Sequence, residues 1–101
     1  MTYKVVIERS AEEEFSAAAE FYDGCRPGLG QRFTRDVLAV FRRASRNPEH
    51  FPRSSGRTRK AKIPHWPYAF YFTIKLDSCE MVITTIWHGS RDPVELRRRL
   101  N

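Results

Sequence analysis

The sequence has few cysteines and no long apolar run. Its 101 residues contain only two cysteines, Cys25 and Cys79, which lie far apart and form no Cys-x-x-Cys pair. This usage does not indicate a zinc site and favours two free thiols over a disulfide. The longest apolar runs, 37–41 and 68–72, hold five residues each, whereas a membrane-spanning helix needs about 20. We therefore expect a protein that does not cross a membrane.

The short motifs that carry cofactor or metal chemistry are also missing. The sequence contains no Gly-rich phosphate loop, no Gly-x-Ser-x-Gly elbow and no His-Glu-x-x-His pair. Its first residues, MTYKVVIE, have no apolar signal-peptide core and no small-residue cleavage site. We expect a cytoplasmic protein that uses no cofactor and no bound metal.

Acidic residues are scarce beyond the first quarter of the chain. Residues 1–25 hold two basic and six acidic residues, whereas residues 26–101 hold sixteen basic and six acidic ones, a net charge of +10. Two basic clusters stand out: Arg53, Arg57, Arg59, Lys60 and Lys62, followed by Arg97, Arg98 and Arg99. Such clusters are typical of contact with an anionic partner, and a solvated face is the alternative.

The hydrophobic pattern of the first half predicts a strand and two helices. Alternation over residues 3–8 predicts the strand. Apolar residues at helical spacing predict a helix over 11–24, with Ser10 and Glu13 as a capping box, and a second helix that Asn47-Pro48 ends. Three glycines and a proline in residues 24–30 predict a tight connection. The two helices should therefore form an antiparallel hairpin with one apolar face.

The second half predicts three strands and a short helix. Residues 48–56 are expected to be a loop, and a strand is expected over 57–63. Strands over 68–76 and 81–88, joined at Asp77-Ser78, should form a central hairpin. Asp92 and Pro93 predict the N-cap and first turn of a helical tail over 94–99. The predicted fold is a single α+β domain, residues 1–101, in the order β-α-α-β-β-β. In it, the helical hairpin packs on one face of a mainly antiparallel four-stranded sheet.

Few side chains outside the basic clusters could carry chemistry. His88, at the end of the last predicted strand, could move a proton, although a histidine there is more often a hydrogen-bonded structural residue. Arg91 could contact a ligand or form a local ion pair with Asp92. We expect packing to be the main role of the remaining histidines, the tryptophans and one mid-strand tyrosine: His50, His65, Trp66, Trp87 and Tyr71.

Six segments in order resemble toxins of the RelE/ParE superfamily of type II toxin–antitoxin (plasmid stabilisation) systems, and the ParE branch in particular. They cover nearly the whole chain: YKVVI at 3–7, the helix at 11–22 with its Phe21-Tyr22 end, PGLGQRF at 27–33, NPEHFP at 47–52, PYAFYF at 67–72 and HGSRDP at 88–93. The resemblance implies a toxin that a cognate, ParD-like antitoxin neutralises in a hetero-oligomer, which meets operator DNA only through the antitoxin. The implied target is DNA gyrase in ParE-like members and ribosome-bound mRNA, cut by a ribose 2′-oxygen, in RelE-like members.

The ribonuclease branch commonly has an Arg at the start of the third strand and a C-terminal Tyr, often near a His that ends the fourth strand. Here those positions are Tyr68 and Gly89, so two expected groups are missing. The resemblance therefore favours a gyrase inhibitor that is not an enzyme, with a ribosome-dependent mRNA endonuclease using His88, Arg91 and Lys62 as the alternative. The residues expected to bind target or antitoxin are Arg57, Arg59, Lys60, Lys62, Arg91, Leu96, Arg97, Arg98 and Arg99.

Three further expectations concern partner contacts. An acidic, partly disordered antitoxin segment should cover the basic sheet and the apolar rim of the helical hairpin. Leu96 and Leu100 should offer an apolar patch beside the C-terminal arginines. Replacing Arg59, Lys60 and Lys62 together by Ala should leave the melting temperature nearly unchanged, because exposed like charges gain little from folding.

Overall fold

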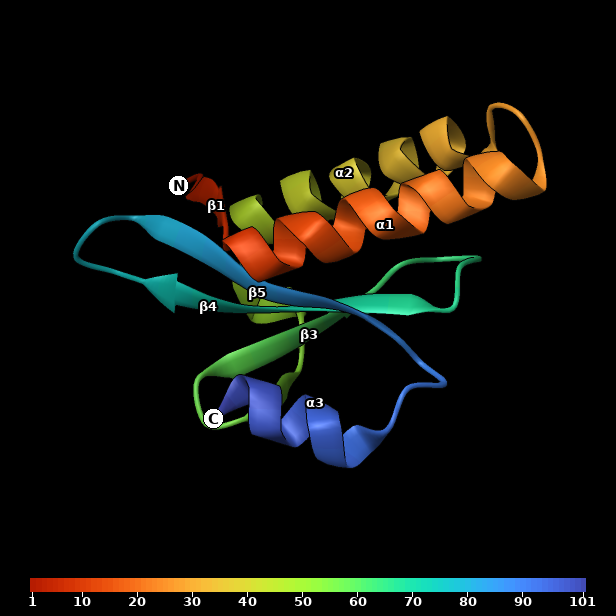
Figure 1. Ribbon diagram of the computed structural model, residues 1–101. Helices are drawn as coiled ribbons and strands as arrows, with labels where there is room; N and C mark the ends of the chain where they lie inside the picture. The colour runs from red at the N-terminus through yellow and green to blue at the C-terminus, as the bar shows by residue number, and fades with distance from the viewer.

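A five-stranded mixed sheet forms the middle layer of the computed structural model, which describes residues 1–101 (Figure 1). The strands are β1 (Lys4–Ile7), β2 (Arg53–Ser55), β3 (Thr58–Lys62), β4 (Tyr68–Lys75) and β5 (Glu80–His88). Their order across the sheet is β1-β5-β4-β3-β2, with β1 parallel to β5 and every other pair antiparallel. The predicted central hairpin, β4 and β5, is confirmed.

The expected number of strands is wrong because the segment 48–56 is not entirely a loop. Its last part turns back at Gly56, whose φ of 53° suits glycine, and β2 pairs with β3. The mainly antiparallel sheet also has one parallel pair at its edge. The helical hairpin carries the chain from β1 to β2 at the opposite edge of the sheet. The antiparallel strands β2 to β5 then lead back across the sheet, so that β5 runs alongside β1 in the same direction.

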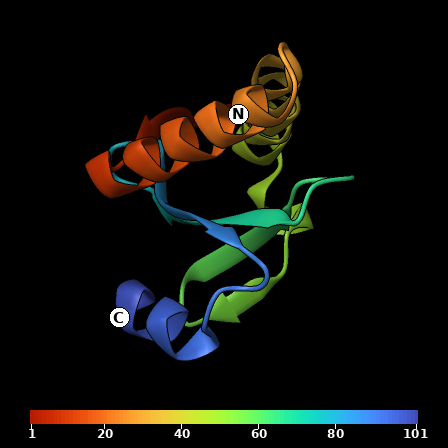
Figure 2. The same ribbon diagram turned by 45° about the vertical axis from the view of Figure 1, so that its right-hand side comes forward.

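Helices α1 (Arg9–Cys25) and α2 (Leu29–Arg46) form the predicted hairpin and cover one face of the sheet (Figure 2). The predicted capping box is wrong, since Ser10 already lies inside α1 and Glu8 is the N-cap residue without a side-chain cap bond. The reason is that Glu8 still pairs with the sheet: its backbone N–H donates to the Ile83 carbonyl at 3.0 Å. The helix therefore starts immediately where the pairing of β1 ends.

The connection between α1 and α2 depends on a close approach at Gly30. Gly28 holds a left-handed φ of 88°, and the backbone N–H of Gly30 donates to Asp23 Oδ1 at 2.8 Å. A Cβ atom at position 30 would collide with the backbone carbonyl oxygen of Ala19. The absence of a side chain at Gly30 is therefore what lets the two helices approach each other closely.

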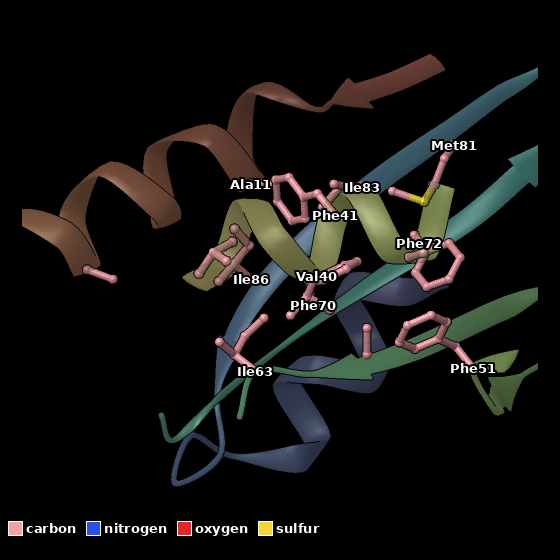
Figure 3. Close-up of a cluster of buried hydrophobic side chains, with 14 of the residues drawn as sticks. Ala11, Val40, Phe41, Phe51, Ile63, Phe70, Phe72, Met81, Ile83 and Ile86 are labelled. Atoms are coloured by element: carbon pink, nitrogen blue, oxygen red, sulfur yellow. The ribbon is translucent and has the colours of Figure 1, made fainter. Parts of the chain in front are cut away.

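The main core lies between the helical hairpin and the sheet (Figure 3). Five apolar residues at helical spacing along α2 are all buried there, which confirms that the second predicted helix is amphipathic: Phe33, Val37, Val40, Phe41 and Ala44. Phe70 and Phe72 of β4 and Ile83 and Ile86 of β5 supply the sheet side. Both cysteines are free, as expected, and no helix is both long and apolar enough to cross a bilayer.

Helix α3 (Pro93–Leu100) covers part of the opposite face of the sheet (Figures 1 and 2). Asp92 is its N-cap, as predicted, and Asp92 Oδ1 accepts a bond from the Val94 N–H at 2.9 Å. Leu96 and Leu100 pack against a second buried cluster of Ala69, Tyr71 and Trp87. The two leucines are therefore half-buried within the chain, which reduces the apolar surface that they can offer to a partner.

Candidate functional site

Strand β3 divides the first basic cluster between the two faces of the sheet. Arg59 pairs with Phe72, which belongs to the main core, so Arg59 lies on the face of the helical hairpin. Lys60 pairs with Tyr71 of the second cluster and therefore lies on the α3 face. Successive side chains of a strand point to opposite faces. The cluster treated as one surface in the sequence is thus two surfaces in the structure.

The first surface, which we name the lysine groove, lies on the α3 face near the β3–β4 turn and has a volume of about 700 Å³. Its polar and charged lining consists of Lys60, Lys62, His65, Tyr68, Tyr71 and Arg91. Trp66, Trp87 and Leu96 supply much of its apolar lining. The groove therefore combines three permanent cations with aromatic surface, a combination suited to an anionic ligand.

Arg91 is held in place at this groove. Its guanidinium stacks 3.7 Å from the centroid of the Trp87 ring and lies 3.6 Å from Glu14 and 3.7 Å from Glu95. The expected alternative, an ion pair with Asp92, does not form, because Asp92 caps α3. The buried Nε1 of Trp87 has no hydrogen-bond partner. Arg91 therefore presents a fixed positive charge next to an unused buried donor.

His88 does not line the lysine groove. It lines a small neighbouring cavity of about 220 Å³ together with Glu14, Phe21, Tyr68 and Arg91. Its Nδ1 accepts the backbone N–H of Ser90 at 3.0 Å. Because a backbone N–H can only donate, the neutral imidazole carries its proton on Nε2. Of the three residues named for a ribonuclease, Arg91 lines both hollows, Lys62 only the groove and His88 only the cavity.

Tyr68 and His65 also line the lysine groove. Burial raises the pKa of the Tyr68 phenol, an effect that the nearby Arg91 charge partly offsets, so Tyr68 stays protonated at neutral pH. His65 is the only imidazole of the lysine groove, although the sequence indicated only a packing role for it. It has a left-handed φ of 73° in the β3–β4 turn. Its place between Pro64 and Pro67 was the only sequence signal for this turn.

The three C-terminal arginines do not form one surface. Arg99 Nη1 donates to Glu14 Oε2 at 2.8 Å and its Nη2 to the Thr84 carbonyl at 3.0 Å, so Arg99 binds within the chain. Arg97 and Arg98 are exposed and form no ion pair. Of the arginines in this cluster, Arg97 and Arg98 alone are therefore free to contact a partner.

Arg57 and Arg59 line a second surface, which we name the arginine groove, together with Arg53. It has a volume of about 880 Å³ and lies where β2, β3 and the end of β4 meet. Arg59 Nη1 donates to the Phe51 carbonyl at 2.7 Å, so this arginine also fastens the segment before β2. Its structural role was not visible in the sequence.

The hydrogen bond of Arg59 changes the stability expected for variants of the basic cluster. Lys60→Gln/Lys62→Gln should change the free energy of unfolding by less than about 0.5 kcal/mol, because neither lysine forms an ion pair. Arg59→Ala should cost about 1–2 kcal/mol, because the Phe51 carbonyl loses its donor. Urea denaturation followed by circular dichroism measures both. Equal stability of Arg59→Ala and the double lysine variant would contradict this assignment.

The helical hairpin on one face of the sheet and the short C-terminal helix are both as the sequence patterns predicted. The family model described as the ParE toxin of the type II toxin–antitoxin system parDE matches residues 5–93, and the chain belongs to this family. The resemblance inferred from six sequence segments is thereby confirmed. No curated protein is similar enough in sequence to count as a relative.

Several solved structures share the fold. The chromosomal ParDE toxin–antitoxin system from P. aeruginosa has a TM-score of 0.74 at 16% identity, covering 86% of this chain and 96% of that chain. The toxin–antitoxin complex RelBE2 from Mycobacterium tuberculosis has a TM-score of 0.63 at 19% identity, covering 87% and 99%. A variant of the E. coli toxin RelE in the free state has a TM-score of 0.59 at 10% identity, covering 97% and 98%. At these identities the likeness concerns the fold.

Proposed function

We propose that this type II toxin acts on DNA gyrase by direct protein contact and does not cleave RNA. The observation that carries this choice is the incomplete chemistry of the lysine groove. Cleavage by a ribose 2′-oxygen needs a base for the hydroxyl and an acid for the leaving oxygen. No carboxylate lines the groove, Tyr68 stays protonated, and His88 lies outside. The groove therefore offers charge for binding but, apart from His65, no side chain suited to move protons at neutral pH.

The outer face of α3 supports contact with a large acidic partner. Val94, Arg97 and Arg98 follow the i, i+3, i+4 spacing of one helix face, and all three are exposed. Leu96 and Leu100 hold the opposite face against the sheet. The fold therefore presents a fixed face that combines positive charge with one apolar side chain.

The antitoxin is the second partner that we propose. The solved relatives include toxin–antitoxin systems of the ParDE and RelBE types. A ParD-like antitoxin would neutralise the toxin in a hetero-oligomer and would itself provide the contact with operator DNA. The chain's net charge of +6 favours an acidic antitoxin segment.

A supercoiling assay with purified gyrase tests the proposed target. The wild-type toxin should inhibit supercoiling, and Arg97→Glu/Arg98→Glu should weaken inhibition by about tenfold or more, because two contact charges are reversed. Arg32→Glu/Arg35→Glu is the matched control, since it reverses two exposed charges on α2. We expect the control and His88→Ala to inhibit as the wild type does.

A ribosome-programmed mRNA cleavage assay gives the opposing outcome. Cleaved mRNA together with unaffected gyrase would overturn the proposal in favour of the RelE-like alternative. Point variants are preferable to a chain ending at Val94, which would also lose Arg99, Leu96 and Leu100. Loss of toxicity in the truncated chain would therefore not distinguish a misfolded toxin from one that has lost its contact with the target.

A further inference from the structure

The arginine groove is a second cationic surface, separate from the lysine groove. It lies on the face of the helical hairpin, beside the end of β4 and the short helix Pro48–His50, whereas the lysine groove lies on the α3 face near the other end of β4. No residue lines both grooves. A ligand in one groove therefore does not block the other by direct contact.

The charges of the arginine groove are unsatisfied within the chain. Arg53 and Arg59 stand directly opposite each other in the β2–β3 pair, and like charges in that position repel. Neither they nor Arg57 and Lys75, which also line the groove, form an ion pair. Arg59 donates one hydrogen bond to the Phe51 carbonyl. This bond fixes the guanidinium and leaves its remaining N–H groups free. A carboxylate between the arginines would relieve their repulsion.

The rest of the lining favours a peptide over a nucleic acid. Tyr3, Ile74 and Leu76 add apolar surface, and Leu76 is 79% exposed. Glu49 and Asp77 also line the groove and would repel a continuous phosphate backbone. Alternating acidic and apolar side chains suit this lining better. Strand β2 is moreover the last strand of the sheet, so its outer backbone edge can pair with an extended segment.

We propose that the arginine groove binds an acidic peptide segment with leucine-like side chains, belonging to a protein partner, independently of the surfaces that contact the toxin's target. The inference rests on the proposed function, in which that segment belongs to the antitoxin. Its consequence is that neutralisation and target contact use different residues. Arg53 and Arg57 serve the first, whereas Arg97 and Arg98 serve the second.

The test measures the affinity of the full chain for a short fluorescent peptide of alternating glutamate and leucine. Arg53→Gln/Arg57→Gln should weaken binding by about tenfold or more, because two charge-assisted contacts are lost. Lys60→Gln/Lys62→Gln removes the same charge from the other face and should change the affinity by less than about twofold. A peptide with serine in place of leucine should bind more weakly to the wild type, and Leu76→Ser should remove that difference. Amide shifts on binding should cluster around Arg53, Arg57 and Leu76.

Two results would overturn the inference. Equal weakening by both double variants would mean that net charge alone attracts the peptide. The second contradicting result is that oligothymidylate of equal charge binds with the same affinity as the peptide and that Leu76→Ser does not change this affinity. The groove would then be assigned to nucleic acid. Gyrase inhibition by the Arg53→Gln/Arg57→Gln variant is measured in parallel and should match the wild type. If the wild type does not inhibit gyrase, the proposed target is wrong, but the peptide-binding result still tests the arginine groove.

Discussion

Gly30→Ala should destabilise the chain by about 3–5 kcal/mol, or prevent folding, because it forces α1 and α2 apart. The new Cβ would collide with the Ala19 carbonyl oxygen, and that oxygen belongs to the backbone of a helix and cannot swing away. It would also press on the Asp23 carboxylate that accepts the Gly30 N–H. Separation of the helices would loosen the packing of Phe33, which is fully buried nearby.

Gly24→Ala is the matched control for this substitution. Gly24 lies in the last turn of α1, has an ordinary backbone conformation and has no atom near the position of a new Cβ. Alanine there should leave stability unchanged or raise it by up to about 1 kcal/mol. Urea denaturation monitored by circular dichroism compares the two variants. A Gly30→Ala chain as stable as Gly24→Ala would show that the helices do not approach as described.

Glu14→Ala should cost about 2–3 kcal/mol and weaken the attachment of α3 to the sheet. The Glu14 carboxylate accepts bonds from Thr85 Oγ1 at 2.8 Å and from the Ile86 N–H at 3.2 Å, and it pairs with Arg99 at 2.8 Å. Its removal leaves a backbone donor without a partner and a half-buried guanidinium without a counter-charge. The expected loss of stability is smaller than for a fully buried ion pair, because 19% of the Glu14 side chain and 27% of the Arg99 side chain are exposed.

Two further variants separate charge from hydrogen bonding at this position. Glu14→Gln keeps an acceptor for Thr85 and Ile86 and should therefore lose less stability than Glu14→Ala. Glu13→Ala removes an exposed carboxylate one residue away and should be nearly neutral. Hydrogen exchange of the Ile86 amide should accelerate only in Glu14→Ala. Equal effects of the Ala substitutions at positions 13 and 14 would contradict the role given to Glu14.

Local patterns predicted most of the elements of this fold. The apolar spacing of α2, from Phe33 to Ala44, and the N-cap of α3 at Asp92 depend on residues close in the chain, and both are confirmed. Strand pairing depends on distant residues. The parallel partner of β1 is β5, so Val6 lies beside Val82, and no local signal identifies that neighbour. The short strand β2 was missed because its residues, Arg53–Ser55, carry no apolar alternation.

The sequence predicted which residue types form the candidate site, but it did not predict which of the basic residues share a surface and which are bound within the chain. Lys60, Lys62 and Arg91 do meet at one groove, although nearly thirty positions separate Lys62 from Arg91. Arg99 looked like its neighbours Arg97 and Arg98, yet its partner Glu14 is 85 residues away. A sequence pattern cannot distinguish a paired arginine from a free one when the partner is so distant. The same limit concealed the bond from Arg59 to the Phe51 carbonyl.

The alternation of side chains along β3 has an evolutionary consequence. Arg59 and Lys60 lie on opposite faces of the sheet, and Ala61, between Lys60 and Lys62, is buried in the main core. Residues on one face of β3 can therefore change without altering the residues on the opposite face. If the arginine groove binds the antitoxin as proposed, a duplicated copy of the gene could acquire a new antitoxin there while the proposed target surface on α3 stayed unchanged. Such a change would need only the codons of Arg53, Arg57 and Arg59, and it would leave Arg97 and Arg98 on α3 as they are.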